Sequence, residues 1–547
     1  MKRFLLLTLS LFITAFPQVQ AQNYLFDAFG EKITVDLLYQ HLSVLASDSL
    51  MGRGTGQEGK QMAADYLANH LAKYGYPELD GFPGFSQHFE LHATAIREVN
   101  YTLTKQGDPQ IHWQATASRG VPTEIFNIFG NEQSLSGQVV FGGLGLMNES
   151  GEINHLKNLD VTGKWVMIFG NLTDEMNNID DELLDQRVMS LLFRQRARGV
   201  LVVNHIDQDE FELESYNMSQ IIGNPSGIRL PDGGGRGGFS VGVKSISPNI
   251  ALQMLNLESQ HQLFDLYEKV VSNYATYVGF ETKYSLNVDT KREDIVIPSV
   301  NVMGFLEGCH EELKHELVVI SAHYDHMGLG TPDSTGDMIY NGADDNGSGT
   351  VTTLALADVL MQARNQGNCL DRSVLFLFVA AEEHGLLGSR YYSDHPVFPI
   401  ENTVANFNLD MFGRIDYDYE GTDQDYVYII GASIISSTLD SLLHVANERT
   451  VQIKLDMRYN DLDDRNQFYR RSDHWNFGRL GVPFIFFFSG LHDDYHEPSD
   501  TVDKIAFELL EKRARLILAT LVEVANAPTR PVVDNQEFIN RTRLPRR

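Results

Sequence analysis

Histidine and carboxylate side chains follow strongly apolar segments at several places in the second half of the chain. The two histidines are His323 and His496, and the carboxylates are Asp410 and the adjacent pair Glu382 and Glu383. A further carboxylate, Asp345, lies in a Gly-rich loop ahead of a predicted helix. Imidazole nitrogens and carboxylate oxygens are common ligands of divalent cations, and two imidazoles with three carboxylates can hold two cations if one carboxylate contacts both. The sequence therefore predicts a metal centre that activates water.

The adjacent glutamates Glu382 and Glu383 end the apolar stretch 374–381. Side chains of neighbouring residues on an extended chain point to opposite sides, so the two carboxylates can serve different purposes. His323 and Asp325 are two residues apart and share a face. Asp325 can thus accept a hydrogen bond from the imidazole nitrogen that does not bind metal.

Two other kinds of hydrolytic site are disfavoured by their spacing. The stretch 310–315, HEELKH, resembles a helical zinc motif. Its second histidine comes five residues after the first rather than four, which takes it off the shared helix face. The Gly-x-Ser-x-Gly motif does not occur in the sequence. Its absence weakens the case for a serine hydrolase.

Continuous apolar segments predict strands that are buried on both faces of a sheet. In the second half of the chain they are residues 300–306, 317–322, 374–381, 404–409, 427–430 and 483–488, with helical stretches between them. Alternating strands and helices indicate an α/β fold. In an open α/β sheet ligands bind at the carboxyl ends of the strands, where the predicted metal ligands lie.

The length of the chain predicts more than one domain, because 547 residues exceed what one hydrophobic core usually organises. Residues 1–21 begin with two cationic side chains, continue with a short apolar run and end in small residues. This pattern is typical of a secretory signal with its cleavage site. We therefore expect a secreted or periplasmic protein without stable membrane insertion. Helical periodicity predicts packing helices over 35–46 and 57–73. Residues 527–547 lack periodicity, which predicts a loose tail.

The net charge bears on possible binding partners, and the cysteine content bears on a possible disulfide. The formal net charge of −30 argues against nucleic acid as a partner, since a nucleic-acid-binding protein needs cationic surface. Cys309 and Cys369 are the only cysteines. A disulfide between them and a pair of free thiols both remain open, because two cysteines do not make a disulfide framework.

Six motifs resemble those of the co-catalytic di-zinc aminopeptidase family, which also includes glutamate carboxypeptidases, the transferrin receptor ectodomain and glutaminyl cyclases. They are HYDHMG (323–328), NGADDNGSG (341–349), AAEEHGLLGS (380–389), NLDM (408–411), SDHWNF (472–477) and YHEPSDT (495–501). The resemblance implies a mixed, mostly parallel central sheet flanked by helices. Its parts would be an N-terminal segment at 22–95 and a catalytic domain at 288–526. The β-rich middle, 96–287, is similar to an inserted protease-associated domain.

The resemblance also implies roles for individual residues. Asp345 would bridge two divalent metal ions, with zinc as the expected metal. His323 and Glu383 would complete one coordination shell, and Asp410 and His496 the other. Glu382 would be the general base, and Tyr469 would hydrogen-bond the substrate oxygen.

The function that the resemblance implies is an exopeptidase acting on peptides with a free N-terminus. Two alternatives stay open within the same family. A glutaminyl cyclase works with a single zinc, and release of ammonia from an N-terminal Gln peptide would identify it. A non-catalytic, receptor-like member would bind no metal.

Overall fold

The computed structural model describes residues 26, 28–129, 134–148, 150–170, 172, 179–233, 242–333 and 335–542. The predicted signal segment, 1–21, lies outside them. The chain divides into two compact units: the first takes Met1–Leu91, Leu230–Gly234 and Ile297–Arg547, and the second takes His92–Arg229 and Gly235–Val296. The sequence placed the corresponding boundaries at 95/96 and 287/288.

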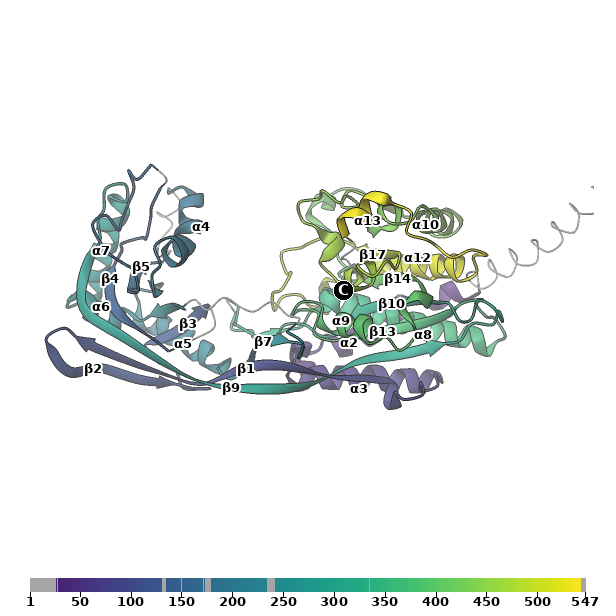
Figure 1. Cartoon of the computed structure of the whole chain (residues 1–547), viewed down its shortest axis with the longest axis horizontal. Coiled ribbons are helices and arrows are strands. Elements are labelled where there is room, and N and C mark those ends of the chain that lie inside the picture. The colour runs from purple at the N-terminus through teal and green to yellow at the C-terminus, as the bar shows by residue number, and fades with distance from the viewer. Residues whose placement is uncertain are drawn as a thin grey trace, which may run out of the picture. The chain divides into compact units, whose positions relative to one another are not determined.

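The first unit contains a mixed, mostly parallel sheet, as predicted. Its strand order is β16 (Lys454–Asp456), β15 (Tyr426–Gly431), β17 (Phe484–Phe488), β14 (Thr403–Leu409), β10 (Leu317–His323), β13 (Ser373–Val379) and the end of β9 (Phe280–Leu306). β10 runs parallel to both of its neighbours, β13 and β14 (Figure 1). The carboxyl ends of these three strands therefore meet at one edge of the sheet.

Side chains of β10, β13 and β14 are buried along their full length, because helices cover both faces of the sheet. On one face Leu375 and Leu377 pack with Tyr392 and Phe477. On the other face Phe376 contacts the Tyr76 ring. The helices of this unit are α2 (Val35–Leu45), α3 (Glu58–Tyr74), α8 (Gly349–Asn365), α9 (Leu387–Asp394), α10 (Ser437–Arg449), α11 (His474–Gly478), α12 (Phe507–Ala525) and α13 (Gln536–Thr542).

The second unit contains the remaining strands of the same 15-stranded sheet and has a hydrophobic core of its own. The start of β9 pairs with β4 (Leu135–Phe141), followed in order by β5 (Trp165–Phe169), β6 (Gly199–Val203), β8 (Gly242–Ile246) and β3 (Ile125–Phe129). β1 (Ser86–Lys105) pairs with β2 (Asp108–Ala117), β7 (Pro225–Arg229) and β9. The helices are α4 (Asp181–Met189), α5 (Gln208–Gln220), α6 (Pro248–Leu255) and α7 (Gln260–Ser272).

The structure corrects one expectation for the first unit and decides another that the sequence left open. Residues 527–547 were expected to form a loose tail, but α13 places Phe538 in the core, where its ring contacts Phe484. Cys309 and Cys369 form a disulfide. No helix in the described part of the chain is both long and apolar enough to cross a bilayer.

Candidate metal centre

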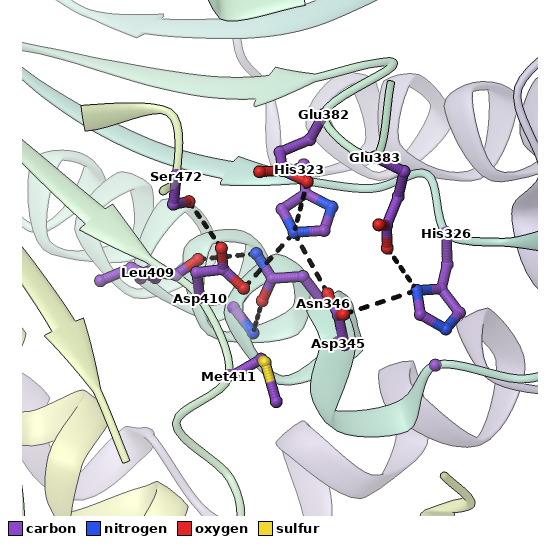
Figure 2. A network of polar contacts seen from close by, with 12 residues as sticks. His323, His326, Asp345, Asn346, Glu382, Glu383, Leu409, Asp410, Met411 and Ser472 are labelled. Carbon is purple, nitrogen blue, oxygen red and sulfur yellow. Dashed lines mark hydrogen bonds and ion pairs between the residues drawn. The ribbon is translucent and has the colours of Figure 1, made fainter. Parts of the chain in front are cut away.

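The predicted ligands lie at one edge of the sheet of the first unit. His323 is the last residue of β10, and Asp410 follows β14 directly. Glu382 and Glu383 follow β13 after Ala381, whose φ of 58° turns the chain out of the strand. His496 lies in the loop after β17 and also has a φ of 58°. Figure 2 shows His323, Asp345, Glu382, Glu383 and Asp410 pointing toward one another.

Asp345 lies between the two predicted histidine ligands. Its Oδ1 atom is 3.3 Å from His323 Nε2, and its Oδ2 atom is 3.1 Å from His496 Nε2. The carboxylate is buried, with 3% of the residue exposed. Each oxygen of Asp345 therefore faces a different imidazole, which is the arrangement that a bridging ligand requires.

A second carboxylate lies beside each imidazole. Asp410 Oδ1 is 3.4 Å from His323 Nε2, and Glu383 Oε2 is 3.1 Å from His496 Nε2. The family resemblance implied the pairs His323 with Glu383 and Asp410 with His496. Ligand atoms of His323, Asp345 and Glu383 also lie within 4.8 Å of one another. The shortest contacts nevertheless favour the other pairing, with Asp410 beside His323 and Glu383 beside His496.

Glu382 points toward a different part of the cluster from Glu383, as the alternation of neighbouring side chains predicts (Figure 2). Its Oε2 atom is 3.9 Å from His323 Nε2, farther than the oxygens of Asp345 and Asp410. Burial raises the pKa of Glu382 well above its usual value, and the nearby carboxylates Glu383 and Asp410 raise it further. A carboxylate with a raised pKa is suited to accept and return a proton near neutral pH.

The charges around Asp345 fit a cation site. Burial opposes ionisation, but the imidazoles of His326, His323 and His496 hold the pKa of Asp345 well below its usual value. The neighbouring imidazoles hold the pKa of Glu383 at about 2, and Asp345 and Glu383 raise the pKa of His496 to about 10. These buried carboxylates are thus stabilised by positive charge at this position.

The donor set supports the same conclusion. The buried Asp410 Oδ1 atom has no hydrogen-bond partner among the described residues. The cluster offers imidazole nitrogens and carboxylate oxygens without thiolates, a set that suits zinc, manganese or cobalt. The residues present therefore fit divalent cations.

Asp325 has a different contact from the one predicted. His323 Nδ1 is 3.1 Å from the backbone carbonyl of Asp325, whereas the Asp325 carboxylate is 4.0 Å away. That carboxylate accepts hydrogen bonds from the Glu382 N–H and the Thr55 hydroxyl instead. Asp325 thus orients the imidazole through its main chain and holds the Glu382 backbone through its side chain.

Two further residues contact this cluster and were missed. His326 Nδ1 is 2.7 Å from Glu383 Oε1, where it can donate a hydrogen bond to that carboxylate. Asp500 Oδ2 accepts hydrogen bonds from the backbone N–H groups of Asp344, at 2.9 Å, and of Asp345, at 3.1 Å. Both residues lie within motifs on which the family resemblance rests. Their place in those motifs was the signal by which they could have been found from the sequence.

A cavity of about 50 Å³ opens beside the cluster. Its apolar wall is formed by Met411, Phe468, Phe486, Phe488 and Leu491, and its polar lining includes Arg471, Ser472 and Tyr495 beside the predicted ligands and Glu382. Tyr469, which was predicted to contact the substrate, is buried with its ring near Trp475 and does not line this cavity. Tyr495 does, and its ring stacks on His496 with centroids 3.9 Å apart.

Sequence comparisons place part of the chain among known peptidases. Residues 301–521 match the model of peptidase family M28. The chain is 29% identical over 243 residues to aminopeptidase YwaD of Bacillus subtilis, which covers 43% of this chain and 46% of that protein. It is 30% identical over 221 residues to leucine aminopeptidase 1 of Coccidioides posadasii, which covers 39% and 53%. The matches span about half the length of these two relatives.

Solved structures share the fold. An aminopeptidase from Aneurinibacillus sp. strain AM-1 has a TM-score of 0.51 at 20% identity and covers 92% of this chain and 97% of its own. A peptidase M28 precursor from Shewanella amazonensis has a TM-score of 0.51 at 17% identity, covering 94% and 98%.

Proposed function

Residues 301–521 belong to peptidase family M28, and from this premise we propose that the protein is a zinc-dependent aminopeptidase. It would remove N-terminal residues from peptides with a free N-terminus. The names of its relatives, aminopeptidase YwaD and leucine aminopeptidase 1, support this activity. The secretory signal expected at residues 1–21 supports a secreted or periplasmic location.

Two divalent cations would be held by separate groups of ligands. His323 and Asp410 would hold one, Glu383 and His496 the other, and Asp345 would contact both. Such cations, when bound, lower the pKa of water toward neutrality and polarise the scissile carbonyl. The observation that carries the proposal is the central position of Asp345, whose two oxygens face His323 and His496 at 3.3 Å and 3.1 Å.

Glu382 would act as the general base. Its carboxylate would take a proton from the attacking water and return it to the departing amine. The Asp325 side chain accepts a hydrogen bond from the Glu382 N–H at 3.2 Å. This bond fixes the position of the backbone from which the Glu382 side chain extends. The raised pKa of Glu382, caused mainly by burial, makes its carboxylate a stronger base and so favours uptake of the proton from water.

The hydroxyl that donates to the substrate oxygen would come from Tyr495. The motif had suggested Tyr469, but Tyr495 lines the cavity and stacks on His496. Burial raises the pKa of Tyr495 above its usual value, which keeps the phenol protonated as a donor. A preorganised donor of this kind stabilises the oxygen as negative charge develops on it.

The two adjacent glutamates provide the test. Glu382→Gln should keep bound zinc but lower kcat for Leu-p-nitroanilide by about 100-fold or more, because it removes the base. Glu383→Ala should instead lower the zinc content, since it removes a ligand. Glu311→Gln changes an exposed glutamate and should alter neither quantity. Zinc content by atomic absorption and kcat would be measured together, and the reverse pattern would contradict the assigned roles.

The single-zinc alternative has less support. The contacts divide the ligands into two groups around Asp345, whereas one cation needs only one group. Titration of metal-free protein with zinc should therefore restore hydrolysis with two equivalents bound. One equivalent, together with ammonia release from an N-terminal Gln peptide, would instead identify a glutaminyl cyclase.

A further inference from the structure

Arg471 lines the cavity beside the metal centre but has no role in the function proposed above. It lies in the segment FYRRSDH, directly after the turn Phe468–Arg470. Its guanidinium lies over the Phe468 ring, 5.1 Å from the centroid. Among the described residues it forms no hydrogen bond or ion pair through its side chain. In a chain with 73 Asp and Glu against 43 Lys and Arg, most cations can find an acidic partner, so an unpaired one here calls for an explanation.

The position of Arg471 brings its charge close to the reacting groups. Tyr495 lines the same cavity and stacks on the predicted ligand His496. A substrate that fills the cavity would therefore meet this guanidinium.

The charge balance of the cavity favours an anionic partner for Arg471. Four carboxylates line it: Asp345, Glu382, Glu383 and Asp410. Two divalent cations would balance these four negative charges, which leaves the guanidinium in excess. A guanidinium presents paired N–H donors that match the two oxygens of a carboxylate.

We propose that Arg471 binds a carboxylate of the peptide substrate and makes the enzyme selective for peptides that carry one. The proposal rests on the aminopeptidase function proposed above. The carboxylate could be the free C-terminus of a dipeptide or the side chain of an N-terminal Asp or Glu. The chemistry is the same in both cases, and the substrates below separate the two sources.

The neighbouring arginine supplies a matched control. Arg470 lies over the rings of Tyr469 and Trp475, at 4.9 Å and 5.0 Å, and does not line the cavity. Both arginines are exposed and adjacent in sequence, so substitution of either changes the net charge equally. Only Arg471 should affect recognition of a carboxylate.

The experiment compares substrates that differ only in the charge. Zinc-loaded enzyme is assayed with Leu-Gly against Leu-Gly-amide, and with Glu-p-nitroanilide against Gln-p-nitroanilide. We expect wild-type kcat/KM to favour the acid in one pair by about 10-fold or more, the usual effect of a charge-assisted hydrogen bond. Arg471→Gln should abolish that preference, Arg471→Lys should keep part of it, and Arg470→Gln should leave it unchanged.

A binding measurement provides a readout apart from turnover. In the Glu382→Gln background, calorimetry gives Kd for the acid and the amide of each pair. Adding Arg471→Gln should reduce the Kd ratio by the same factor as the kcat/KM ratio, whereas adding Arg470→Gln should not.

Each outcome has one meaning. A lost preference in the dipeptide pair assigns the C-terminal carboxylate, and a lost preference in the p-nitroanilide pair assigns the acidic side chain. If wild type prefers neither acid, or if Arg471→Gln keeps the preference, the proposal is overturned. If zinc-loaded wild type hydrolyses none of the four substrates, the aminopeptidase function fails, and the calorimetric ratio alone decides whether Arg471 binds a carboxylate.

Discussion

At the residue scale, His326 lies beside the proposed metal ligands. Its Nδ1 atom lies 2.7 Å from Glu383 Oε1 and 3.8 Å from Asp345 Oδ2, so it contacts two of the proposed ligands (Figure 2). Residues that hydrogen-bond to metal ligands fix their orientation, and their loss weakens metal binding.

We therefore expect His326→Gln to lower zinc affinity by about 10- to 100-fold without abolishing binding. Competition with a chromophoric chelator would measure the change. The control is His310→Gln, which alters an exposed histidine of the zinc-like motif at 310–315 and should have no effect. Equal affinities of wild type and His326→Gln would show that the 2.7 Å contact does not orient Glu383.

The sequence indicated which residues belong to the proposed centre, but it did not indicate which carboxylate lies beside which imidazole. His323, Glu383 and Asp410 could be predicted because each follows an apolar run that must be a buried strand. Which carboxylate lies beside which imidazole depends on strand order, and the sequence does not contain that order. Tyr495 and Tyr469 are both near motif histidines, and only the folded loops decide which one lines the cavity.

At the scale of elements, α2 and α3 meet through a buried histidine. His41 lies between the hydroxyls of Tyr66, at 2.8 Å, and Tyr74, at 3.1 Å. Burial, together with the nearby charges of His70 and Lys73, lowers the pKa of His41 from 6.5 to about 4. Below pH 6.5 the unfolded chain binds a proton at this residue that the folded chain does not, so stability falls as pH drops from 6.5 toward 4.

This shift predicts a loss of about 2 kcal/mol of stability at pH 5 relative to pH 7.5, since each pKa unit corresponds to about 1.4 kcal/mol. His41→Gln should remove this part of the pH dependence, although it lowers stability at both values. Urea unfolding at the two pH values would measure it. His444→Gln, whose side chain is 47% exposed, should retain the wild-type dependence. If His41→Gln kept the wild-type pH dependence of stability as well, His41 would not be held neutral in the folded protein.

Elements were predictable where local sequence determines them. β10, β13 and β14 agree with the predicted strands within two residues at each end, because continuous apolar runs of that length have few other stable arrangements. α13 could not be predicted in the same way. Its seven residues, QEFINRT, show no clear periodicity, and Phe538 is buried through contacts with a distant part of the chain.

At the scale of the whole molecule, each unit has a hydrophobic core of its own. The second unit buries Trp165, Leu201 and Val203, and the first buries Leu317, Leu377 and Phe477. The sequence indicated a change of character near residue 288, but the boundary lies at Val296/Ile297, within β9. Residues 280–296 include many exposed positions, so the start of this long strand carries a weaker apolar signal than its end.

The separate cores predict two unfolding transitions in calorimetry, of which only one depends on metal. All the proposed ligands belong to the first unit, and a ligand stabilises only the unit that binds it, by about 4 kcal/mol at a thousand-fold excess over Kd. A chelator should therefore lower the Tm of one transition. Leu377→Ala, in the first core, should lower the same transition, and Leu201→Ala, in the second core, should lower the other, because each leaves a cavity that costs about 2–5 kcal/mol. A single transition that shifts with all three changes would mean that the cores unfold together.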